Sequence, residues 1–282
     1  MTDPNDIRHE TRQRWERQAA GWSAQRARLQ AATAPVSHWL VEAIDPQPGQ
    51  RVLELAAGPG DTGFLAAELL RPAGTLISTD IAEPMLDVAR ARAAELGLDN
   101  VEFRAMDAEW IDLPAASVDA VLCRWGYMLL VDPAAALRDT RRVLRPGGRL
   151  ALAAWTDPED NPWSAVPHQE LVRMGAEAPT PRDEPGQFAW REEATIRAAL
   201  EEAGFVAPVI EQVGFEFRFE DLDAWWDAQL EFSARLHDAV AKLTPAQRDE
   251  LREAIDARLA PHVAPDGTVA LPARTHVAAA EA

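Results

Sequence analysis

The sequence contains only one cysteine, Cys123, among its 282 residues. A single thiol excludes an internal disulfide and any zinc site built from several thiolates, so we expect no bound metal. Long apolar runs are also missing, because no stretch approaches the roughly 18 apolar residues needed to cross a bilayer. Residues 1–22 lack the apolar centre of a signal peptide. These absences predict a cytoplasmic protein without a membrane-spanning segment.

Positive charge is scarce as well. Lys and Arg number 28 against 46 Asp and Glu, which gives a formal net charge of −18. Binding to a nucleic-acid backbone or to an anionic membrane requires concentrated basic side chains. We therefore expect neither nucleic acid nor membrane as a partner, and a small neutral or cationic molecule as the ligand. The oligomeric state stays open, with a homodimer among the alternatives.

Apolar and alternating segments recur between helical patterns along most of the chain. Seven of them are predicted strands: residues 51–55, 75–79, 101–104, 118–123, 149–155, 205–219 and 268–279. The first five alternate with helices that we predict over residues 62–70, 84–96 and 133–144. This alternation is typical of a parallel sheet with helices on both faces, the doubly wound α/β class.

Polar helical segments precede and interrupt this pattern. Residues 1–34 are predicted to form an N-terminal helical lid that ends at Ala34-Pro35, with a short helix over residues 36–44 after it. The main domain then covers residues 35–282. It carries a loop-rich insertion at about 157–190 and a helical insertion at about 221–262, which we expect to complete the lid.

A glycine-rich turn follows the first predicted strand. Gly58, Gly60 and Gly63 fit the pattern G-x-G-x-x-G, in which backbone approaches a ligand at a helix N-terminus. That pattern alone favours NAD as readily as another nucleotide, and it also fits a tight turn without a ligand. Asp80 ends the second strand about 20 residues later, with a carboxylate that can accept hydrogen bonds from both ribose hydroxyls. The two elements together favour an adenosyl ligand.

With these residues in place, the chain resembles the class I S-adenosylmethionine-dependent methyltransferases, especially the ubiquinone/menaquinone-biosynthesis type (UbiE-like, methyltransferase type 11). The resemblance covers roughly residues 35–155 and is carried by residues 52–60, 79–89, 106–109 and 143–148. It implies S-adenosylmethionine as the cofactor and methyl transfer to a small organic acceptor, with O-, C- and N-methylation left open. The implied fold is a Rossmann-like, mostly parallel seven-stranded sheet with an antiparallel last strand.

The resemblance also implies roles for the residues of the glycine turn. Glu54 is similar to the acidic residue that helps hold the methionine amino group. Gly58 and Gly60 resemble the loop beneath the methionine and ribose portions. Ala56 stands where the family has its first glycine, which implies slightly less room at the strand end. Asp80 resembles the ribose ligand.

The remaining contacts to the methyl donor follow from the same resemblance. Ile81 and Met85 are expected to line the adenine, although Met85 also fits a plain core position. Asp107 and the backbone of Ala108 resemble the group that reads the adenine amino edge. The alternative for Asp107 is to cap the following turn. Cys123 is expected beside the methyl-donor pocket.

Residues beyond the fourth strand and in the lid are candidates for catalysis and acceptor binding. Arg124 is expected to line the donor pocket, and with Tyr127 and His168 it is a candidate catalytic residue, because some acceptors need a base. Each of these three also fits a packing or surface role. Trp22 and Trp155 are the candidate substrate residues, in an aromatic acceptor pocket under the lid. The alternative is that their rings anchor accessory helices.

Two other functions stay open from the sequence. A NAD(P)-dependent oxidoreductase fits the glycine pattern, but Val131 stands where a short-chain dehydrogenase would have Lys, four residues after Tyr127. A non-catalytic S-adenosylmethionine-binding protein is the second alternative, since no base is identified. A phosphate-binding nucleotidase is excluded because no Gly-Lys-Ser/Thr follows the glycines.

Overall fold

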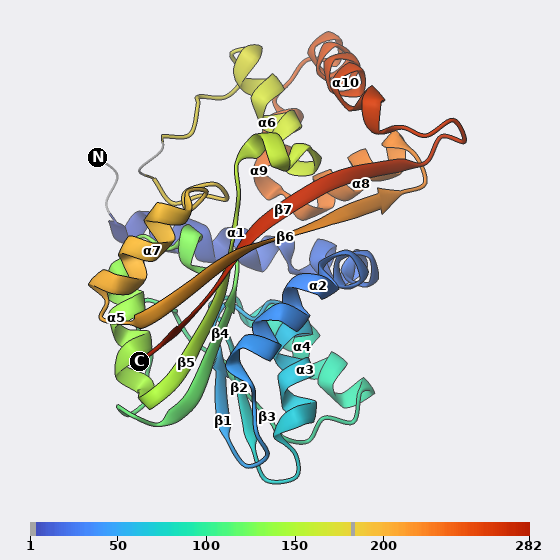
Figure 1. Cartoon of the computed structure of the whole chain (residues 1–282). Coiled ribbons are helices and arrows are strands. Elements are labelled where there is room, and N and C mark those ends of the chain that lie inside the picture. Colours follow the sequence, from blue (N-terminus) through green and yellow to red (C-terminus); the bar gives the residue numbers. More distant parts are fainter. Residues whose placement is uncertain (1–3, 182–183) are drawn as a thin grey trace.

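A twisted sheet of seven strands runs through the molecule (Figure 1), in a computed structural model that describes residues 4–181 and 184–282. The strands are β1 (Arg51–Glu54), β2 (Thr75–Asp80), β3 (Val101–Ala105), β4 (Val118–Arg124), β5 (Leu144–Trp155), β6 (Val206–Phe219) and β7 (Val269–Glu281). Their order is β3-β2-β1-β4-β5-β7-β6, and β7 pairs antiparallel with both β5 and β6. The predicted fold class, strand number and antiparallel last strand are confirmed.

Helices bury apolar side chains on both faces of the sheet. On one face lie α2 (Arg26–Ile44), α3 (Asp61–Leu70) and α4 (Glu83–Glu95), which share a core with β1 and β2. The opposite core includes α5 (Pro133–Val143) and α7 (Glu193–Glu202). Strands covered on both faces carry continuous apolar runs, and Val52 and Leu53 of β1 are accordingly fully buried.

Five further helices gather at the end of the sheet where β5 leads into α6 (Figure 1). They are α1 (Pro4–Ala24), α6 (Pro162–Arg173), α8 (Leu222–Phe232), α9 (Ala234–Ala241) and α10 (Pro245–Leu259). α1 packs against α4, α8 and α9, and α6 packs against α10. Within the described residues, no helix is both long and apolar enough to span a bilayer.

The helix boundary predicted at Ala34-Pro35 is wrong. α2 continues through Pro35, because a buried stripe that includes Leu29 and Leu40 holds the whole helix on the sheet. Pro35 leaves the carbonyl of Ala31 without its helical partner, but both residues are exposed, so water can supply the missing hydrogen bond. Residues 1–3 of the predicted lid lie outside the described residues.

The segment at 157–190, predicted to be loop-rich, contains the helix α6. Pro162 occupies its first turn, where a missing N–H costs nothing, and Trp163, Val166 and Leu171 are buried along it. The prediction of a loop is therefore wrong for this part, because packing outweighs the local proline content. Residues 174–181 and 184–190 form no helix or strand. Residues 182–183 lie outside the described residues.

The start of β5 also differs from the prediction. Leu144 pairs with Val118 and Arg149 pairs with Ala120, so residues 145–148 bulge out between two paired positions. The Arg-Pro-Gly-Gly turn therefore interrupts the strand instead of preceding it.

Candidate functional site

The carboxyl ends of β1, β2 and β4 lie side by side, because these strands are parallel neighbours. Glu54 at the end of β1 pairs with Ser78 of β2 and with Leu122 of β4. This register brings Glu54, Asp80 and Arg124 to one edge of the sheet, where the glycine turn leads into α3. In open α/β sheets, ligands bind at this edge.

Glycine is needed in the turn for two different reasons. Gly58 and Gly60 have φ angles of 54° and 87°, in the left-handed region that favours glycine. At Gly63 the reason is space, since a Cβ atom there would overlap the carboxylate of Glu54. The Gly63 N–H instead donates a hydrogen bond to Glu54 Oε1 at 2.8 Å. The turn thus lets a carboxylate reach the first turn of α3.

Ala56, which replaces the first glycine of the family pattern, also has a positive φ angle, of 50°. A left-handed conformation costs a non-glycine residue about 1–2 kcal/mol. Room for its methyl group comes from Gly126, just after β4. A Cβ atom on Gly126 would lie 2.9 Å from Ala56 Cβ and 2.6 Å from the sulfur of Cys123. The missing side chain at Gly126 therefore leaves room for the methyl group of Ala56.

The Glu54 carboxylate is almost completely buried, with 3% of the residue exposed. Burial raises its pKa from 4.5 to about 7, and the hydrogen bond from Gly63 and the charge of Arg124 oppose this rise only in part. Its Oε2 accepts one further hydrogen bond, from Ser78 Oγ at 3.3 Å. A cationic group brought to this edge would favour the ionised form of Glu54.

Asp80 is buried at the end of β2, and both of its carboxylate oxygens accept backbone hydrogen bonds. Gly58 N–H donates to Oδ2 and Ala82 N–H donates to Oδ1, each at 2.9 Å. Burial raises the pKa of Asp80, against the effect of these two bonds. Each oxygen retains a second lone pair, so the carboxylate can still accept from hydroxyl groups.

Asp61, the first residue of α3, is a member of this site that the sequence analysis missed. The residue is 6% exposed, and neither carboxylate oxygen has a hydrogen-bond partner within residues 4–181 and 184–282. Burial raises its pKa, while the nearby charge of Arg124 lowers it. A buried carboxylate without donors is suited to a cationic ligand group. The available signal was its position directly after Gly60.

Arg124 balances Asp61 from the end of β4. Its guanidinium lies 3.9 Å from Asp61 Oδ2 and donates hydrogen bonds to Thr33 Oγ1 at 2.6 Å and Ser37 Oγ at 3.2 Å on α2. Burial lowers the pKa of Arg124. The side chain also stacks over the ring of Trp125, 4.8 Å from its centroid. Arg124 is therefore held in place beside the glycine turn.

The N-terminal helix α1 covers the side of the site next to β3. Met85 is buried in a small cluster with Ala19 and Ala82, and Trp22 packs against this cluster. Ile81 is half-buried and directly precedes Ala82 in the sequence. Met85, for which a core position is the alternative to an adenine contact, thus lies under the helix predicted to form the lid.

The turn after β3 is tied to α1 as well. Asp107 Oδ1 accepts a hydrogen bond from Glu109 N–H at 2.9 Å, so Asp107 caps the turn, the alternative to reading the adenine amino edge. Ala108 is buried next to it. Glu109 accepts a hydrogen bond from Arg8 Nε at 3.0 Å, and its other oxygen accepts from Val131 N–H at 2.7 Å.

Tyr127 and Cys123 are both enclosed in the core below the site. The Tyr127 hydroxyl lies 2.6 Å from Thr140 Oγ1 on α5, and burial raises its pKa well above the ordinary value. Its ring stacks on Trp190 with centroids 5.8 Å apart. Burial also raises the pKa of the Cys123 thiol to about 12. These environments favour the packing role for Tyr127 and a neutral thiol at Cys123.

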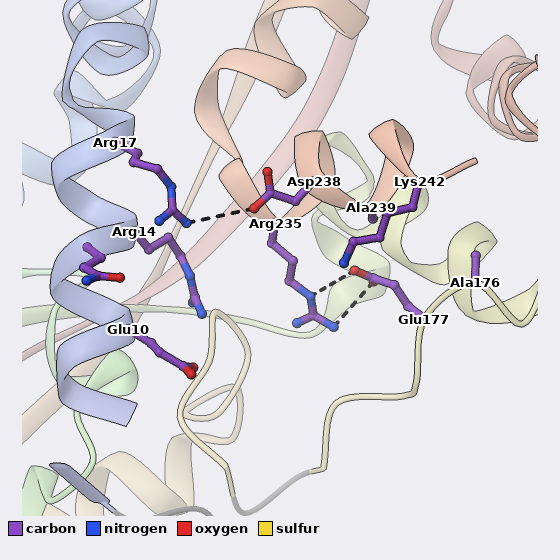
Figure 2. Close-up of a pocket in the computed structure, with 10 residues that line it drawn as sticks. Glu10, Arg14, Arg17, Ala176, Glu177, Arg235, Asp238, Ala239 and Lys242 are labelled. Carbon is purple, nitrogen blue, oxygen red and sulfur yellow. Dashed lines mark hydrogen bonds and ion pairs between the residues drawn. The ribbon is translucent and has the colours of Figure 1, made fainter. Parts of the chain in front are cut away.

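His168, the third catalytic candidate, lies on α6 among ion-paired side chains. Its Nδ1 is 3.1 Å from Oε2 of Glu177, and Arg235 of α9 binds the same carboxylate at 3.1 Å. Figure 2 shows Glu177 and Arg235 facing each other across the space beside α1. The hydrogen bond to Glu177 therefore links His168 to the segment after α6. The structure does not bring His168 together with Glu54, Asp80 and Arg124.

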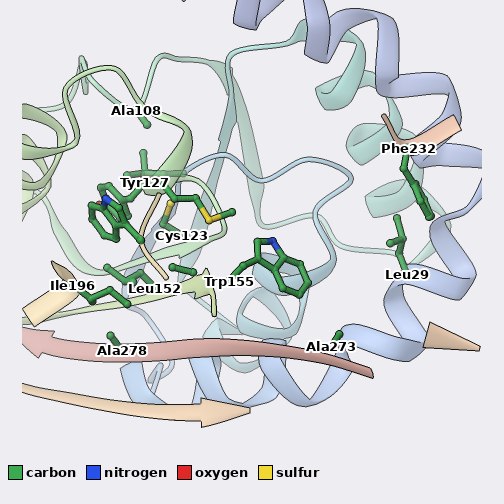
Figure 3. Close-up of a cluster of buried hydrophobic side chains, with 14 of the residues drawn as sticks. Leu29, Ala108, Cys123, Tyr127, Leu152, Trp155, Ile196, Phe232, Ala273 and Ala278 are labelled. Atoms are coloured by element: carbon green, nitrogen blue, oxygen red, sulfur yellow. The ribbon is translucent and has the colours of Figure 1, made fainter. Parts of the chain in front are cut away.

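Aromatic side chains form a wall beyond the end of β5. We call this set the aromatic wall: Trp125, Trp155, Trp163, Phe215 and Phe217. Trp155 stacks on Trp125 with centroids 4.3 Å apart and lies 5.3 Å from Trp163. Figure 3 shows Trp155 between the Cys123–Tyr127 side of the core and Phe232 with Leu29 on the other side.

Two tryptophans bury polar atoms without partners: Trp163 of the aromatic wall, and Trp22, whose ring packs on Phe232 of α8. The indole N–H groups of Trp22 and Trp163 are inaccessible to solvent and have no hydrogen-bond acceptor in the described part of the chain. The amide nitrogen of Gln229 on α8 is in the same condition. An indole nitrogen can only donate, so these groups lack an acceptor atom.

Comparisons with known proteins agree on one family. A model described as a methyltransferase domain matches residues 46–183. Demethylmenaquinone methyltransferase from Clavibacter sepedonicus is 34% identical over 175 residues, covering 58% of this chain and 69% of that protein. Nocamycin O-methyltransferase from Saccharothrix syringae is 37% identical over 143 residues, and the chain spans only 50% of its length, with 50% of this chain matched. The solved YcgJ protein from Bacillus subtilis shares the fold, with a TM-score of 0.57 and 19% identity, covering 87% of this chain and 97% of that one.

The chain belongs to the class I S-adenosylmethionine-dependent methyltransferases. Within that class it is of the ubiquinone/menaquinone-biosynthesis type, so the resemblance found in the sequence is confirmed. S-adenosylmethionine is the cofactor, and the nicotinamide alternative is not supported. The described residues fit this cofactor, because Asp61 offers a buried carboxylate whose oxygens accept no hydrogen bond and Asp80 keeps lone pairs for hydroxyl groups.

Proposed function

We propose that this protein transfers the methyl group of S-adenosylmethionine to a small organic acceptor that presents oxygen atoms as hydrogen-bond acceptors. One observation supports both halves of the proposal: among the buried side-chain atoms that lack a hydrogen-bond partner in the described residues, which also include Asn100 Oδ1 and His276 Nδ1, two sets are of opposite kinds. Beside the glycine turn these are the carboxylate oxygens of Asp61, which suit a cation. Beside α8 they are the N–H groups of Trp22 and Trp163, which suit an oxygen.

The donor side uses the carboxylates of the strand edge. Asp61 and Glu54 would hold the amino group of the methionine portion, since both are buried and a cation would favour their ionised forms. Asp80 would accept hydrogen bonds from the ribose hydroxyls while keeping its two backbone donors. Met85 and Ile81 would pack against the adenine.

The remaining residues of the donor pocket would contact the other parts of S-adenosylmethionine. Gly58 and Gly60 would lie beneath the methionine and ribose portions, next to Ala56. Asp107 has one oxygen committed to its turn, which leaves the other for the adenine amino edge, beside Ala108. Arg124 would act by holding Asp61 in position.

The acceptor side is organised by one face of α8. Trp225 Nε1 donates to the backbone oxygen of Trp163 at 3.1 Å, and the Phe232 ring lies 6.1 Å from that of Trp22. Residues 225, 229 and 232 are spaced to share one helix face, which extends over about 10 Å. Along this face, Gln229 therefore lies between Trp225, which contacts Trp163, and Phe232, which contacts Trp22. An acceptor of about two rings could satisfy donors at both ends.

We assign α1, residues 157–181 and 184–190, and residues 221–262 to a lid over both pockets. The contact between Arg8 and Glu109 fastens α1 next to the donor side, and Trp22 contacts both Met85's cluster and Phe232. A closed lid excludes water, which strengthens the electrostatic interactions inside.

Catalysis would rest mainly on positioning. S-adenosylmethionine supplies a methyl group already activated on a sulfonium, so the protein need not create a strong electrophile. Holding the acceptor in line with that methyl group provides most of the rate enhancement. Since Tyr127 and His168 are hydrogen-bonded elsewhere, an acidic acceptor hydroxyl or carbon that ionises readily fits this protein better than one that needs a strong base.

The names of the relatives are compatible with such an acceptor. One relative is named for demethylmenaquinone and another for the O-methylation of nocamycin. We propose an acceptor of comparable type, a small molecule that carries several oxygen atoms.

Calorimetry with S-adenosylmethionine, S-adenosylhomocysteine and NAD in parallel tests the donor half. We expect both adenosyl-sulfur ligands to bind and NAD not to bind. Turnover on a panel of phenols, quinols and amines then tests the acceptor half. Methylation of phenols or quinols is the expected result, whereas binding of the donor without turnover on any of them would favour the non-catalytic alternative.

A further inference from the structure

A cavity of about 320 Å³ lies outside the methyl-donor site, between α1, the segment after α6, and α9 (Figure 2). Its walls come from residues 10–17, residues 176–177 and residues 235–242. These three stretches belong to the three segments that we assign to the lid. A ligand in this cavity would therefore contact all of them.

The cavity gathers positive charge in a protein that is acidic overall. Four basic side chains line it: Arg14 and Arg17 on α1, Arg235 on α9, and Lys242 directly after α9. Lys242 is the only lysine in the chain. Three carboxylates face them, from Glu10, Glu177 and Asp238. The lining therefore has a positive balance, against a net charge of −18 for the whole chain.

Two of the four cations are already paired. Arg235 binds Glu177 through Nε at 3.1 Å and through a second nitrogen at 3.4 Å. Arg17 lies 3.9 Å from Asp238. Glu177 also bonds His168, so its charge is shared between two partners.

Arg14 and Lys242 have no hydrogen bond or ion pair with any other described residue through their side chains. Figure 2 shows the Arg14 side chain extending from α1 toward Arg235 on the opposite wall. Desolvation, and after it the charge of Arg235, lowers the pKa of Arg14, and Glu10 offsets this in part. An added negative charge would relieve this repulsion.

We propose that this cavity binds an oxyanion, a phosphate or carboxylate group, between Arg14 and Lys242. The guanidinium of Arg14 can bind two oxygens of such a group, and the ammonium of Lys242 can bind it from the α9 side. The bound anion links α1 to α9 by charge-assisted hydrogen bonds. It thereby fastens the N-terminal helix to the C-terminal helices at a point separate from the methyl-donor pocket.

Calorimetry with sodium phosphate and with sodium acetate, each against sodium chloride of equal ionic strength, tests this site without the methyl donor. The variants are the double substitution Arg14→Gln with Lys242→Gln, and Arg12→Gln as a matched control, since Arg12 is an exposed arginine of α1 that does not line the cavity. We expect saturable binding of at least one anion to the wild type and to Arg12→Gln. The double variant should bind at least about tenfold more weakly, because it loses the charge-assisted hydrogen bonds from both side chains.

A third variant changes binding in the opposite direction. Glu10 lines the cavity and makes no hydrogen bond or ion pair with another described residue through its side chain. Glu10→Gln removes this carboxylate and should tighten anion binding severalfold, which loss of structure would not do. Hydrogen exchange should also show that the bound anion slows exchange in α1 and α9 of the wild type. The proposal is overturned if no anion binds saturably to the wild type, or if the double variant binds as tightly as the control. Because no methyl donor is present, this outcome is independent of the proposed function.

Discussion

Replacing Glu54 with glutamine removes a buried charge that lowers the free energy of unfolding. Burial raises the pKa of Glu54 from 4.5 to about 7, so the native state binds its proton more tightly than the unfolded state does. A difference of this size corresponds to about 3 kcal/mol in the free energy of unfolding. Stability from this group is present at low pH and is lost as the pH rises from about 4.5 through about 7.

Glu54→Gln should therefore stabilise the protein most where Glu54 is ionised. Without the methyl donor, we expect the free energy of unfolding to rise by up to about 3 kcal/mol at pH 8 and by less than about 1 kcal/mol at pH 5. Glutamine keeps the local geometry, because its side-chain oxygen can accept from Gly63 N–H and its amide can donate to Ser78 Oγ.

The same variant should bind the cofactor more weakly. If Glu54 holds the amino group, wild-type affinity for S-adenosylhomocysteine rises as the pH is raised through about 7, since the carboxylate is the binding form. Glu54→Gln should lose this affinity and lose its contribution to the pH dependence. A variant that gains unfolding free energy but loses cofactor affinity would indicate that Glu54 is retained for function and not for stability.

Urea unfolding followed by tryptophan fluorescence at pH 5 and pH 8 gives the stability change, and calorimetry gives the affinity. Glu68→Gln is the control, because Glu68 is exposed on the same helix, α3, that begins at the glycine turn. An unfolding free energy that drops at pH 8, together with unchanged cofactor affinity, would refute the reasoning.

Three further substitutions test other parts of the site. Asp80→Asn should weaken binding of the methyl donor by about tenfold or more while the protein stays folded, measured by calorimetry, because charge-assisted bonds to the ribose are lost; equal affinity would exclude the ribose role. Gly63→Ala should lower the free energy of unfolding by about 1–3 kcal/mol in urea, since its Cβ would overlap Glu54, whereas Gly214→Ala has room and should change it little. Trp163→Phe should raise the KM for the acceptor found in the panel without changing donor affinity, and the exposed Trp110→Phe should alter neither.

The sequence predicted the sheet because its strands are short, apolar and separated by turn residues. It also predicted that Asp80 ends the second strand, and β2 does end at Asp80. Both inferences depend on local pattern and on topology alone. They required no knowledge of which side chains pack against each other.

The features that were missed depend on contacts between distant parts of the chain. Asp61 lies buried beside Arg124, which arrives from β4, so its burial is not visible in the glycine turn itself. The space that Gly126 provides for Ala56 is likewise a contact across two strands. α2 passes through Pro35 because packing on the sheet outweighs the missing hydrogen bond, which local rules for proline do not anticipate.

The position of β7 has a consequence for how the sheet is completed. β7 lies between β5 and β6, although both of these precede it in the chain. Until residues 269–281 are in place, β5 ends the sheet with an open edge and the long strand β6 pairs with no other strand of the described residues. A nascent or truncated chain without this segment would expose two unpaired strands, which is the arrangement from which β-rich proteins aggregate.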